Sequence, residues 1–586
     1  MNEIANHADG GSERVESWTA RVWPSWLVVV LQASLFVLCV TPSIDNFVRF
    51  IFLMAGPLAC FVLFSLAFVF FSRLRWWVSL STLAFTMLLG IVAVQFSAPR
   101  TEIAYWMYGV PLTMMLISVG LLACRRVKPI GQLVGMTLLV SLGWGWLSII
   151  RIDGIDGSYV PDIAFRWSPS SEQRLLANSD FELPEGSEPK GWEVHSESWP
   201  GFRGRNRDSR VTDPISPMDW EVEPPRERWR RPVGPGWSSM TVVSGRLFTQ
   251  EQRGDDELVV CYDANTGTLI WFHAEPSRFE EVTSGAGPRA TPTYADGRVF
   301  AYGAKGILVA LDAFTGQLLW KRDLMQEVNA KLPVWGFSSS PAVFGDVVLV
   351  YAGGDGNDGL MALDCSTGET RWSNPASGMN FSSAQPATIN GQSMAVFIQA
   401  GSARGLSPRT GEELWRYDIE GGSDPPIVQA QQITDDMLIV PLGDGIGVAA
   451  VSIQQEASGN WKATERWQSR NLKPSFNDFV YHDGALYGFD KEIFACIDAS
   501  NGKRLWKRGR YGFGQAVILE SCRQILVTTE QGEVVLVDAV PNRFQELGRI
   551  ECLANKTWNH PVVAENKLYV RNSEEMVCYD LASNSR

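Results

Sequence analysis

The sequence predicts a membrane domain of five transmembrane α-helices followed by an all-β propeller of eight blades. Two observations support this prediction. Five long apolar stretches lie before residue 151, and a phrase of the form apolar-x-Asp-x-x-Thr-Gly-x-x-x-Trp recurs eight times, complete or degenerate, between residues 263 and 580. The phrase returns roughly every 40 to 50 residues, which is the length of one four-stranded propeller blade.

The apolar stretches define the membrane domain. They are Trp26–Thr41, Phe50–Phe71, Trp76–Phe96, Ala104–Cys124 and Ile130–Ile150. Most are long enough to cross a hydrocarbon core of about 30 Å, and the first is the shortest. That first stretch does not read as a signal peptide, because no small-residue cleavage site follows it and four more spans do.

None of the five stretches contains Asp, Glu, Lys, Arg or His. Ionisable residues inside a membrane usually mark a proton or ion pathway, so this composition argues against a pump or a transporter. We interpret the helices as a membrane anchor. A quinone-docking module is the alternative.

Basic residues in the flanks predict the orientation. With the N-terminus inside, the inner segments carry Arg14, Arg21, Arg73, Arg75, Arg125, Arg126 and Lys128, and the outer ones carry Arg49, Arg100 and Arg151. This excess favours a cytoplasmic N-terminus. Five spans then place the propeller on the opposite side, so we expect a multi-pass protein of the bacterial inner membrane with a periplasmic C-terminal domain. The expected divisions are 1–22 cytoplasmic N-terminus, 23–150 membrane domain, 151–225 periplasmic linker and lead-in, and 226–586 propeller.

Each part of the repeated phrase has a mechanical role. Clear copies begin at Asp263, Asp312 and Asp364, weaker copies at Ser407 and Asp498, and residual copies at Ser452, Asp538 and Asp580. We expect the carboxylate to accept hydrogen bonds from the turn that follows it, and the glycine to supply the positive φ of a tight hairpin. The tryptophan is expected to bury its ring between neighbouring blades.

The ring is expected to close through an N-terminal strand. The eighth copy, at Asp580, lies near the chain end and has no tryptophan, whereas Trp229 stands just before the first blade. The strand that carries Trp229 can complete the last blade. Closure of this kind removes exposed sheet edges.

The phrase resembles the PQQ-like repeat of quinoprotein propellers. Quinone-dependent alcohol and glucose dehydrogenases share that repeat with the propeller lipoprotein of the outer-membrane β-barrel assembly complex. The resemblance covers the chain from about Arg226 to its end, and it implies the fold rather than an activity. The stretch Glu197–Val211, ESWPGFRGRNRDSRV, is similar to the lead-in found before such propellers. We expect residues 151–225 to be a partly ordered linker that packs on the rim of the propeller, with a short helix capped by Ser168.

The resemblance leaves two functions to weigh. In layout the chain is similar to a membrane-bound quinoprotein glucose dehydrogenase. Enzymes of that kind bind a planar quinone over the ring axis, together with a metal ion and an Asp that acts as general base, and the resemblance implies the same site here. Three features of the sequence argue against an enzyme of this kind. It has no pair of adjacent cysteines, its blades are short, and no metal-ligand motif of these dehydrogenases matches it. We expect a non-catalytic scaffold with no cofactor and no catalytic or metal residues. The alternative is a dehydrogenase that uses PQQ with Ca²⁺ and feeds membrane quinone.

Polar residues before the inner strands are the candidate ligand site. Those expected at the channel mouth are Arg289, Ser340, Asn477, Asp478, Gln515, Asn559 and His560, with Ser239, Thr291, Ser383 and Gln429 at equivalent places. Aromatic residues accompany them at Trp237, Trp335, Phe381, Phe476 and Trp558. Such a set suits a small polar or anionic ligand with Arg289 as its charge partner. The alternative is that these residues satisfy the inner-strand backbone and bound water.

The net charge and the spacing of the cysteines argue against two classes of function, nucleic-acid binding and a C-x-x-C metal or redox site. The formal net charge of −13 gives no support for nucleic-acid binding. The nine cysteines lack a C-x-x-C pair, and three of them precede a repeat Asp by two residues, which is typical of strand core. We expect the chain to associate with the inner membrane and to bind a protein or another envelope component at a face of the propeller, and we expect no nucleic-acid partner.

Overall fold

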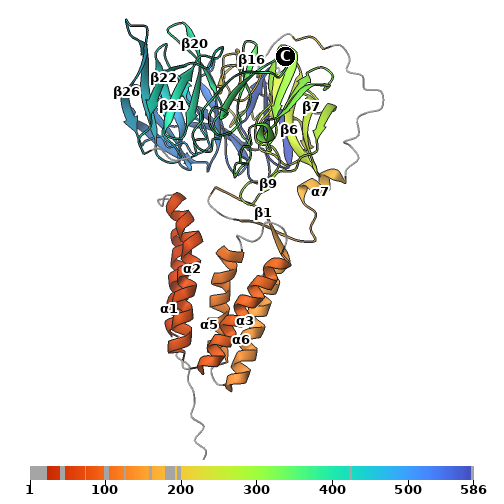
Figure 1. The fold of residues 1–586 in the computed structure, drawn as a ribbon, viewed down its shortest axis with the longest axis vertical. Helices are drawn as coiled ribbons and strands as arrows, with labels where there is room; N and C mark the ends of the chain where they lie inside the picture. Colours follow the sequence, from red (N-terminus) through yellow and green to blue (C-terminus); the bar gives the residue numbers. More distant parts are fainter. Residues whose placement is uncertain are drawn as a thin grey trace, which may run out of the picture. The chain divides into compact units, whose positions relative to one another are not determined.

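The computed structural model describes residues 23–39, 46–72, 74–97, 105–124, 127–157, 161–177, 192–194, 199–421 and 425–581. The chain divides into two compact units, residues 1–168 and 169–586. In the described residues, the first unit is mainly helical and the second consists of β-strands and two short helices (Figure 1).

Apolar helices make up most of the first unit, as predicted. They are α1 (Trp23–Cys39), α2 (Asn46–Phe71), α3 (Trp76–Gln95), the π-helical turn η1 (Tyr105–Gly109) that runs into α5 (Val110–Ala123), and α6 (Pro129–Ser148). Four stretches are long and apolar enough to cross a membrane: Ile51–Phe71, Trp76–Gln95, Tyr105–Ala123 and Ile130–Ser148. Helix α1 is apolar but shorter. Its own crossing of a membrane therefore stays a prediction.

Small residues let one large ring enter this helix bundle. The Trp144 ring stacks on Tyr105 with centroids 5.8 Å apart. A Cβ atom on Gly90 or Gly109 would lie 3.0 or 2.9 Å from the same indole. Close helix packing through glycine is the usual way in which membrane helices associate.

The region expected to be a linker contains regular structure. Strands β1 (Ile150–Ile155) and β2 (Pro161–Phe165) form an antiparallel hairpin directly after α6. Helix α7 (Ser171–Leu176) follows in the second unit. Its cap is Ser170 rather than Ser168, because the Ser170 hydroxyl accepts the Gln173 N–H while the Gln173 side chain accepts the Ser170 N–H.

Eight sheets form the predicted propeller, and in seven of them the four blade strands follow one another outward in chain order. Blade 1 contains β5 (Thr241–Val243), β6 (Arg246–Arg253), β7 (Asp256–Asp263) and β8 (Leu269–Glu275), and blade 2 contains β11 (Thr293–Ala295), β12 (Arg298–Tyr302), β13 (Ile307–Asp312) and β14 (Leu318–Asp323). Blade 3 contains β15 (Ala342–Phe344), β16 (Val347–Tyr351), β17 (Leu360–Asp364) and β18 (Thr370–Asn374). Blade 4 contains β19 (Gln385–Ile389), β20 (Gln392–Gln399), β21 (Ser402–Leu406) and β22 (Glu413–Asp418). A small hairpin, β9 (Glu280–Glu281) with β10 (Gly285–Ala286), precedes blade 2, and helix α8 (Leu324–Glu327) follows it.

Blades 5 to 7 repeat this order, whereas blade 8 takes its fourth strand from the segment before blade 1. Blade 5 contains β23 (Gln431–Gln432), β24 (Met437–Pro441), β25 (Val448–Gln455) and β26 (Trp461–Ser469). Blade 6 contains β27 (Val480–His482), β28 (Ala485–Asp490), β29 (Ile493–Asp498) and β30 (Arg504–Arg510). Blade 7 contains β31 (Gln515–Leu519), β32 (Gln524–Thr528), β33 (Glu533–Asp538) and β34 (Glu546–Glu551). Blade 8 is β35 (Val562–Ala564), β36 (Lys567–Arg571) and β37 (Glu575–Asp580), completed by β4 (Arg226–Pro232). Trp229 of β4 lies opposite Cys578 of β37, which confirms the predicted closure.

Tryptophans join five of the blades to the blade that follows, as predicted. The indole N–H donates to a backbone carbonyl of the following blade at 2.9 to 3.3 Å, in the pairs Trp229–Ala264, Trp271–Ala313, Trp320–Cys365, Trp372–Pro408 and Trp506–Val540. The rings also cover the glycine of the next phrase, so a Cβ on Gly316 would meet Trp271 at 2.6 Å. Trp415 departs from the pattern and donates to the sulfur of Met394 in its own blade.

The turn chemistry of the phrase is also confirmed. The Asp263 Oδ1 atom accepts the N–H groups of Asn265 and Thr266, each at 2.9 Å. Gly267 has a φ of 71°, a left-handed conformation that favours glycine. The nine cysteines are free thiols, and Cys261, Cys496 and Cys578 lie in the strand core as expected.

Replacing Trp320 by Ala tests the inter-blade role of the ring. The side chain is 9% exposed, and its loss removes both the buried ring and the bond to Cys365. We expect the free energy of unfolding to fall by about 3 to 5 kcal/mol, seen as a lower urea midpoint in far-ultraviolet circular dichroism. Leu319→Ala is the control, because this neighbour is 48% exposed and its change should stay within about 0.5 kcal/mol. Equal losses in the two variants would contradict the role.

Candidate functional site

Hydrogen bonds between blades engage many of the candidate channel residues. Each bond runs from a backbone N–H to the equivalent side chain of the next blade: Ser239 to Thr291 (3.0 Å), Thr291 to Ser340 (2.9 Å), Ser340 to Ser383 (2.9 Å) and Asp478 to Gln515 (3.3 Å). Between blades 1 and 8, the Ser239 hydroxyl donates to the His560 carbonyl at 2.7 Å. These side chains thus satisfy the backbone where the inner strands begin.

The lead-in segment, residues 199–211, lies across the inner ends of the blades. Trp199 pairs with Val242 of blade 1, and Arg210 and Val211 form β3 (Arg210–Val211), a parallel strand beside β31 of blade 7. Contacts of the segment reach seven blades, at Val242, Tyr294, Pro341, Gln385, Phe479, Ile518 and His560. Part of the region expected to be a linker is therefore buried in the propeller.

Left-handed backbone makes the lead-in compact. Arg203, Arg207 and Ser209 have φ values of 62°, 56° and 56°, which are uncommon for residues other than glycine. The Ser209 N–H donates to the Arg203 carbonyl at 2.8 Å, so the chain folds back on itself. Strained conformations of this kind persist only where surrounding contacts fix them.

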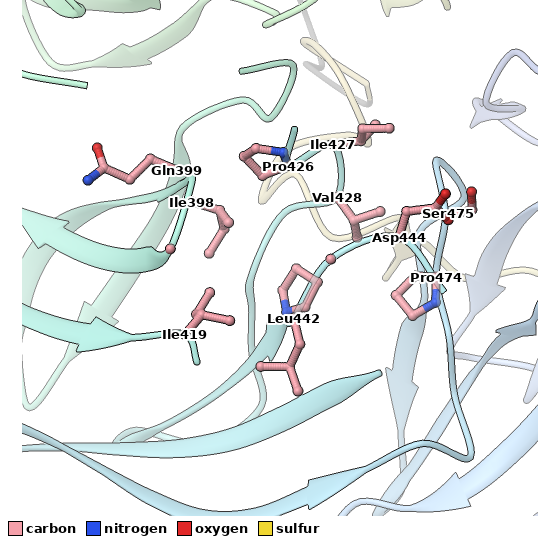
Figure 2. Close-up of a pocket in the computed structure, with 13 residues that line it drawn as sticks. Ile398, Gln399, Ile419, Pro426, Ile427, Val428, Leu442, Asp444, Pro474 and Ser475 are labelled. Carbon is pink, nitrogen blue, oxygen red and sulfur yellow. The ribbon is translucent and has the colours of Figure 1, made fainter. Parts of the chain in front are cut away.

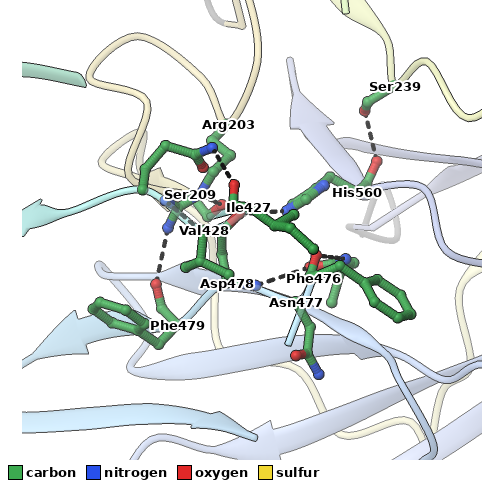
Figure 3. A network of polar contacts seen from close by, with 12 residues as sticks. Arg203, Ser209, Ser239, Ile427, Val428, Phe476, Asn477, Asp478, Phe479 and His560 are labelled. Carbon is green, nitrogen blue, oxygen red and sulfur yellow. Dashed lines mark hydrogen bonds and ion pairs between the residues drawn. The ribbon is translucent and has the colours of Figure 1, made fainter. Parts of the chain in front are cut away.

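Asp478 is the centre of a buried charge network (Figure 3). Its two carboxylate oxygens contact Arg203 Nη1 at 3.2 Å and His560 Nε2 at 3.0 Å. Burial alone raises the pKa of Asp478, but the Arg203 guanidinium and the His560 hydrogen bond hold it below its ordinary value. Burial lowers the pKa of His560. The neutral imidazole therefore bonds to an ionised carboxylate that Arg203 neutralises.

A second buried arginine of the lead-in binds backbone oxygens. Arg207 donates to the carbonyls of Pro341 (2.8 Å) and Ser340 (3.1 Å). Burial, together with the nearby Arg203 charge, lowers the pKa of Arg207 to about 9, so the side chain stays protonated at neutral pH. The Phe202 ring packs edge-on against His560 with centroids 4.8 Å apart.

Arg289, the expected charge partner of a ligand, is held by its own loop. Its Nη2 atom donates to the Gly285 carbonyl (2.9 Å) and the Ser284 hydroxyl (2.8 Å), and it lies 3.5 Å from Glu281. The guanidinium also stands 4.8 Å from the centroid of the Phe279 ring. The structure does not bring Arg289 to the Asp478 network.

The two candidate asparagines are buried and bond locally. Asn559 donates to the Ser238 carbonyl at 2.8 Å, and the Asn477 side-chain oxygen accepts the Ser475 N–H at 3.0 Å. The Asn477 Nδ2 and Asn559 Oδ1 atoms are buried without a protein partner. Bound water is the natural partner for such atoms.

Aromatic rings gather at the starts of the inner strands, as expected. Trp558 lies 4.9 Å from Trp237 and 5.0 Å from Phe476, and Phe476 stacks on Phe513 at 5.2 Å. Lys556 stands over the Trp558 ring at 4.3 Å. Phe476 and Trp558 belong to the loops before blades 6 and 8, so these rings meet across blade 7.

Two clefts lie outside the Asp478 network. The first, between blades 4 and 5, is lined by apolar residues that include Ile398, Pro426 and Leu442 (Figure 2). The second, of about 330 Å³, lies between these blades and the lead-in. Neither is lined by any of the seven candidate residues. Across the described parts of the chain, no group of three or more His, Cys, Asp or Glu residues is placed to hold a metal ion.

The sequence predicted packing of this region on the propeller's rim, whereas the structure buries the lead-in across the inner ends of the blades. The signal that was available is the density of charge and aromatic residues in WPGFRGRNRD, which is unusual for a solvated linker. Long charged side chains also occur on exposed loops, so composition alone does not identify Asp478 as the partner of Arg203.

Comparisons with known proteins agree with the repeat. Residues 255–508 match the family model described as outer membrane protein assembly factor BamB. The protein of that name from Shewanella oneidensis is 24% identical over 371 residues, covering 59% of this chain and 86% of the relative. The quinohemoprotein alcohol dehydrogenase ADH-IIG of Pseudomonas putida is 28% identical over 211 residues, or 33% of this chain and 26% of the enzyme. The repeats are thus PQQ-like, as predicted.

Solved structures of both kinds resemble the chain. BamB from Moraxella catarrhalis aligns with a TM-score of 0.45 and 16% identity over 62% of this chain and 98% of the other. Quinohemoprotein alcohol dehydrogenase from Comamonas testosteroni aligns with a TM-score of 0.49 and 12% identity over 67% and 81%.

Replacing Arg203 by Met tests the charge pair. The change leaves the Asp478 carboxylate buried without its cation, so we expect a loss of about 3 to 5 kcal/mol in unfolding free energy by urea denaturation. Arg205→Met is the control, because Arg205 is an exposed residue of the same segment. Adding Asp478→Asn to Arg203→Met should recover part of the loss, since the two residues are coupled. Additive effects would contradict the pair.

Replacing His560 by Gln tests its titration. The folded pKa of His560 lies below the unfolded value of about 6.5, so its contribution to stability is present above pH ~6.5 and is lost as the pH falls below it. Glutamine keeps a donor for Asp478 and does not titrate. The thermal midpoint should therefore fall less between about pH 7 and 5 in His560→Gln than in the unmodified protein. Burial also lowers the pKa of His482, which gives both proteins the same residual slope.

Proposed function

We propose that this chain, whose propeller consists of PQQ-like repeats, is a non-catalytic binding scaffold anchored in the bacterial inner membrane. The N-terminus is cytoplasmic and the propeller is periplasmic. Its partner is a protein or another envelope component that binds the propeller. The match to outer membrane protein assembly factors supports a binding role, and the apolar helices support membrane association.

One observation carries the preference for a scaffold over an enzyme. The inner ends of the blades are occupied by the chain's own lead-in, in which Trp199 and Arg203 are each 1% exposed. The resemblance to dehydrogenases implies a planar quinone at the ring axis. The residues present do not fit that group, because seven blades already contact the lead-in there.

The metal expected with such a quinone does not fit the axis either. Dehydrogenases of this kind are expected to hold the ion with carboxylate and amide oxygens. The axial carboxylate here, Asp478, is neutralised by Arg203 and bonded to His560. A cation beside it would have to displace the buried guanidinium.

A quinone-binding titration tests this function. The detergent-solubilised full chain, mixed with PQQ and Ca²⁺, should show no saturable change in quinone absorbance and no dye-linked oxidation of glucose or ethanol. The Arg203→Met variant, in which the lead-in is loosened, should likewise show no quinone binding and no dye reduction. Micromolar quinone binding with dye reduction would overturn the proposal and favour the dehydrogenase.

Capture from membranes tests the binding role. The full chain, crosslinked in cells and purified in mild detergent, should retain a defined partner. Arg289→Ala should retain it equally, because Arg289 bonds to its own loop. Failure to recover any partner from crosslinked membranes would contradict the scaffold.

A further inference from the structure

The hairpin that follows the last helix has one apolar face and one charged face. Strands β1 and β2 pair so that Ile150 lies opposite Phe165 and Ile152 lies opposite Ile163. Opposite residues of an antiparallel pair share a face of the sheet, and alternate residues along a strand return to it. Trp167 extends this apolar face, because its ring stacks on Phe165 with centroids 4.8 Å apart. The other face carries Arg151, Asp162 and Arg166.

The β2 side of the apolar face is open to the surroundings. Ile163, Phe165 and Trp167 are 55%, 40% and 68% exposed, whereas Ile150 and Ile152 of β1 are buried. Three large apolar side chains in a row on one strand face form a contiguous exposed patch. Patches of this kind mark contact with a membrane or with another protein.

The exposed face of the hairpin continues an exposed apolar row of α6. Residues four apart are neighbours on a helix surface. The large apolar residues at this spacing in α6 are all more than half exposed, and they are Ile130, Val134, Leu138, Leu142 and Trp146. This row belongs to a helix that is long and apolar enough to cross a membrane. It ends at Trp146, whose ring packs edge-on against Phe165 with centroids 6.0 Å apart.

Arg166 fixes the hairpin to the ends of two helices. Its Nη1 atom donates to the carbonyl of Phe96, which caps α3, at 2.6 Å, and to the carbonyl of Ser148, the last residue of α6, at 3.2 Å. The last carbonyls of a helix have no partner within the helix, so one guanidinium satisfies two helix ends. The hairpin is therefore held at the end of two apolar spans, which is where a hydrocarbon core meets the lipid headgroups.

We propose that the β1–β2 hairpin lies in the headgroup region of the membrane that the helices cross, with its apolar face toward the acyl chains and its charged face toward water. Tryptophan is enriched at this depth, because its ring is apolar while its N–H can bond to headgroups or water. Continuity with the exposed row of α6 favours lipid over a protein as the occupant, since a protein on this face would have to displace the lipid around Trp146. The inference rests on the membrane anchoring proposed above and adds a lipid contact outside the spans.

Fluorescent labels in lipid nanodiscs test the depth of the hairpin. The full chain is reconstituted with phosphatidylethanolamine and phosphatidylglycerol, so that both membrane surfaces stay open to solvent. A nitrobenzoxadiazole label is attached to the Ile163→Cys variant. The matched control is Asp162→Cys, because Asp162 is the exposed neighbour on the charged face. The unsubstituted chain, treated in the same way, gives the background from its nine native cysteines.

The two labels should respond in opposite ways. A lipid that carries a nitroxide near its headgroup should quench the label of Ile163→Cys several times more strongly than the label of Asp162→Cys. Dithionite, which acts from the water, should reduce the label of Asp162→Cys faster. Because both replaced side chains are exposed, neither change should lower the thermal midpoint. Equal reduction of the two labels by dithionite would overturn the proposal.

A third label separates the hairpin from the anchor. Leu138 lies in the exposed row of α6, so a label on Leu138→Cys should be quenched by a nitroxide placed deep in the acyl chain. Quenching in Leu138→Cys without quenching in Ile163→Cys would overturn the interfacial hairpin and leave the anchoring intact. If the Leu138→Cys label is not quenched either, the proposed anchoring fails as well. An Ile163→Cys label that escapes both dithionite and the lipid nitroxide would reveal a protein cover, which also overturns the proposal.

Discussion

Five of the eight blades are joined to the next blade by a tryptophan whose indole N–H donates to a backbone carbonyl. Trp271 reaches Ala313 and Trp320 reaches Cys365, and each ring covers the glycine of the following phrase. A single blade buries its faces only against its neighbours, so these contacts have to continue around the ring. Strand β4 makes this possible because it brings Trp229 into blade 8, from where the indole reaches Ala264 of blade 1.

Most of the fold could be predicted because its determinants are local and repeated. The Asp263 carboxylate and the Gly267 backbone act within one turn, and repetition of the phrase multiplies that signal. Trp415 shows where the rule ends. The phrase of the next blade is degenerate at Ser452, and Trp415 bonds instead to Met394 in its own blade.

The axial contacts could not be predicted in the same way. Arg203 and Asp478 are separated by 275 residues, and no periodicity links them. Arg289 was the natural choice for an axial charge because it precedes an inner strand, yet its own loop supplies its partners. Several of the polar residues before the inner strands bond from blade to blade, but which of them meet the Asp478 network depends on the lead-in, which no repeat describes.

The contacts that hold the lead-in and β4 can form only late in synthesis, because their partners lie far along the chain. The lead-in and β4 are synthesised before any blade, yet Asp478 and Asp580, the partners of Arg203 and Arg228, follow 275 and 352 residues later. During vectorial synthesis β4 therefore has no strand to pair with until β37 is made, and Arg203 and Arg228 lack their carboxylate partners in the meantime. Long-range closure of this kind is slow, and the edges remain open to wrong pairing until it occurs. Strand β37 thus fixes the place of β4, which precedes every blade in the chain.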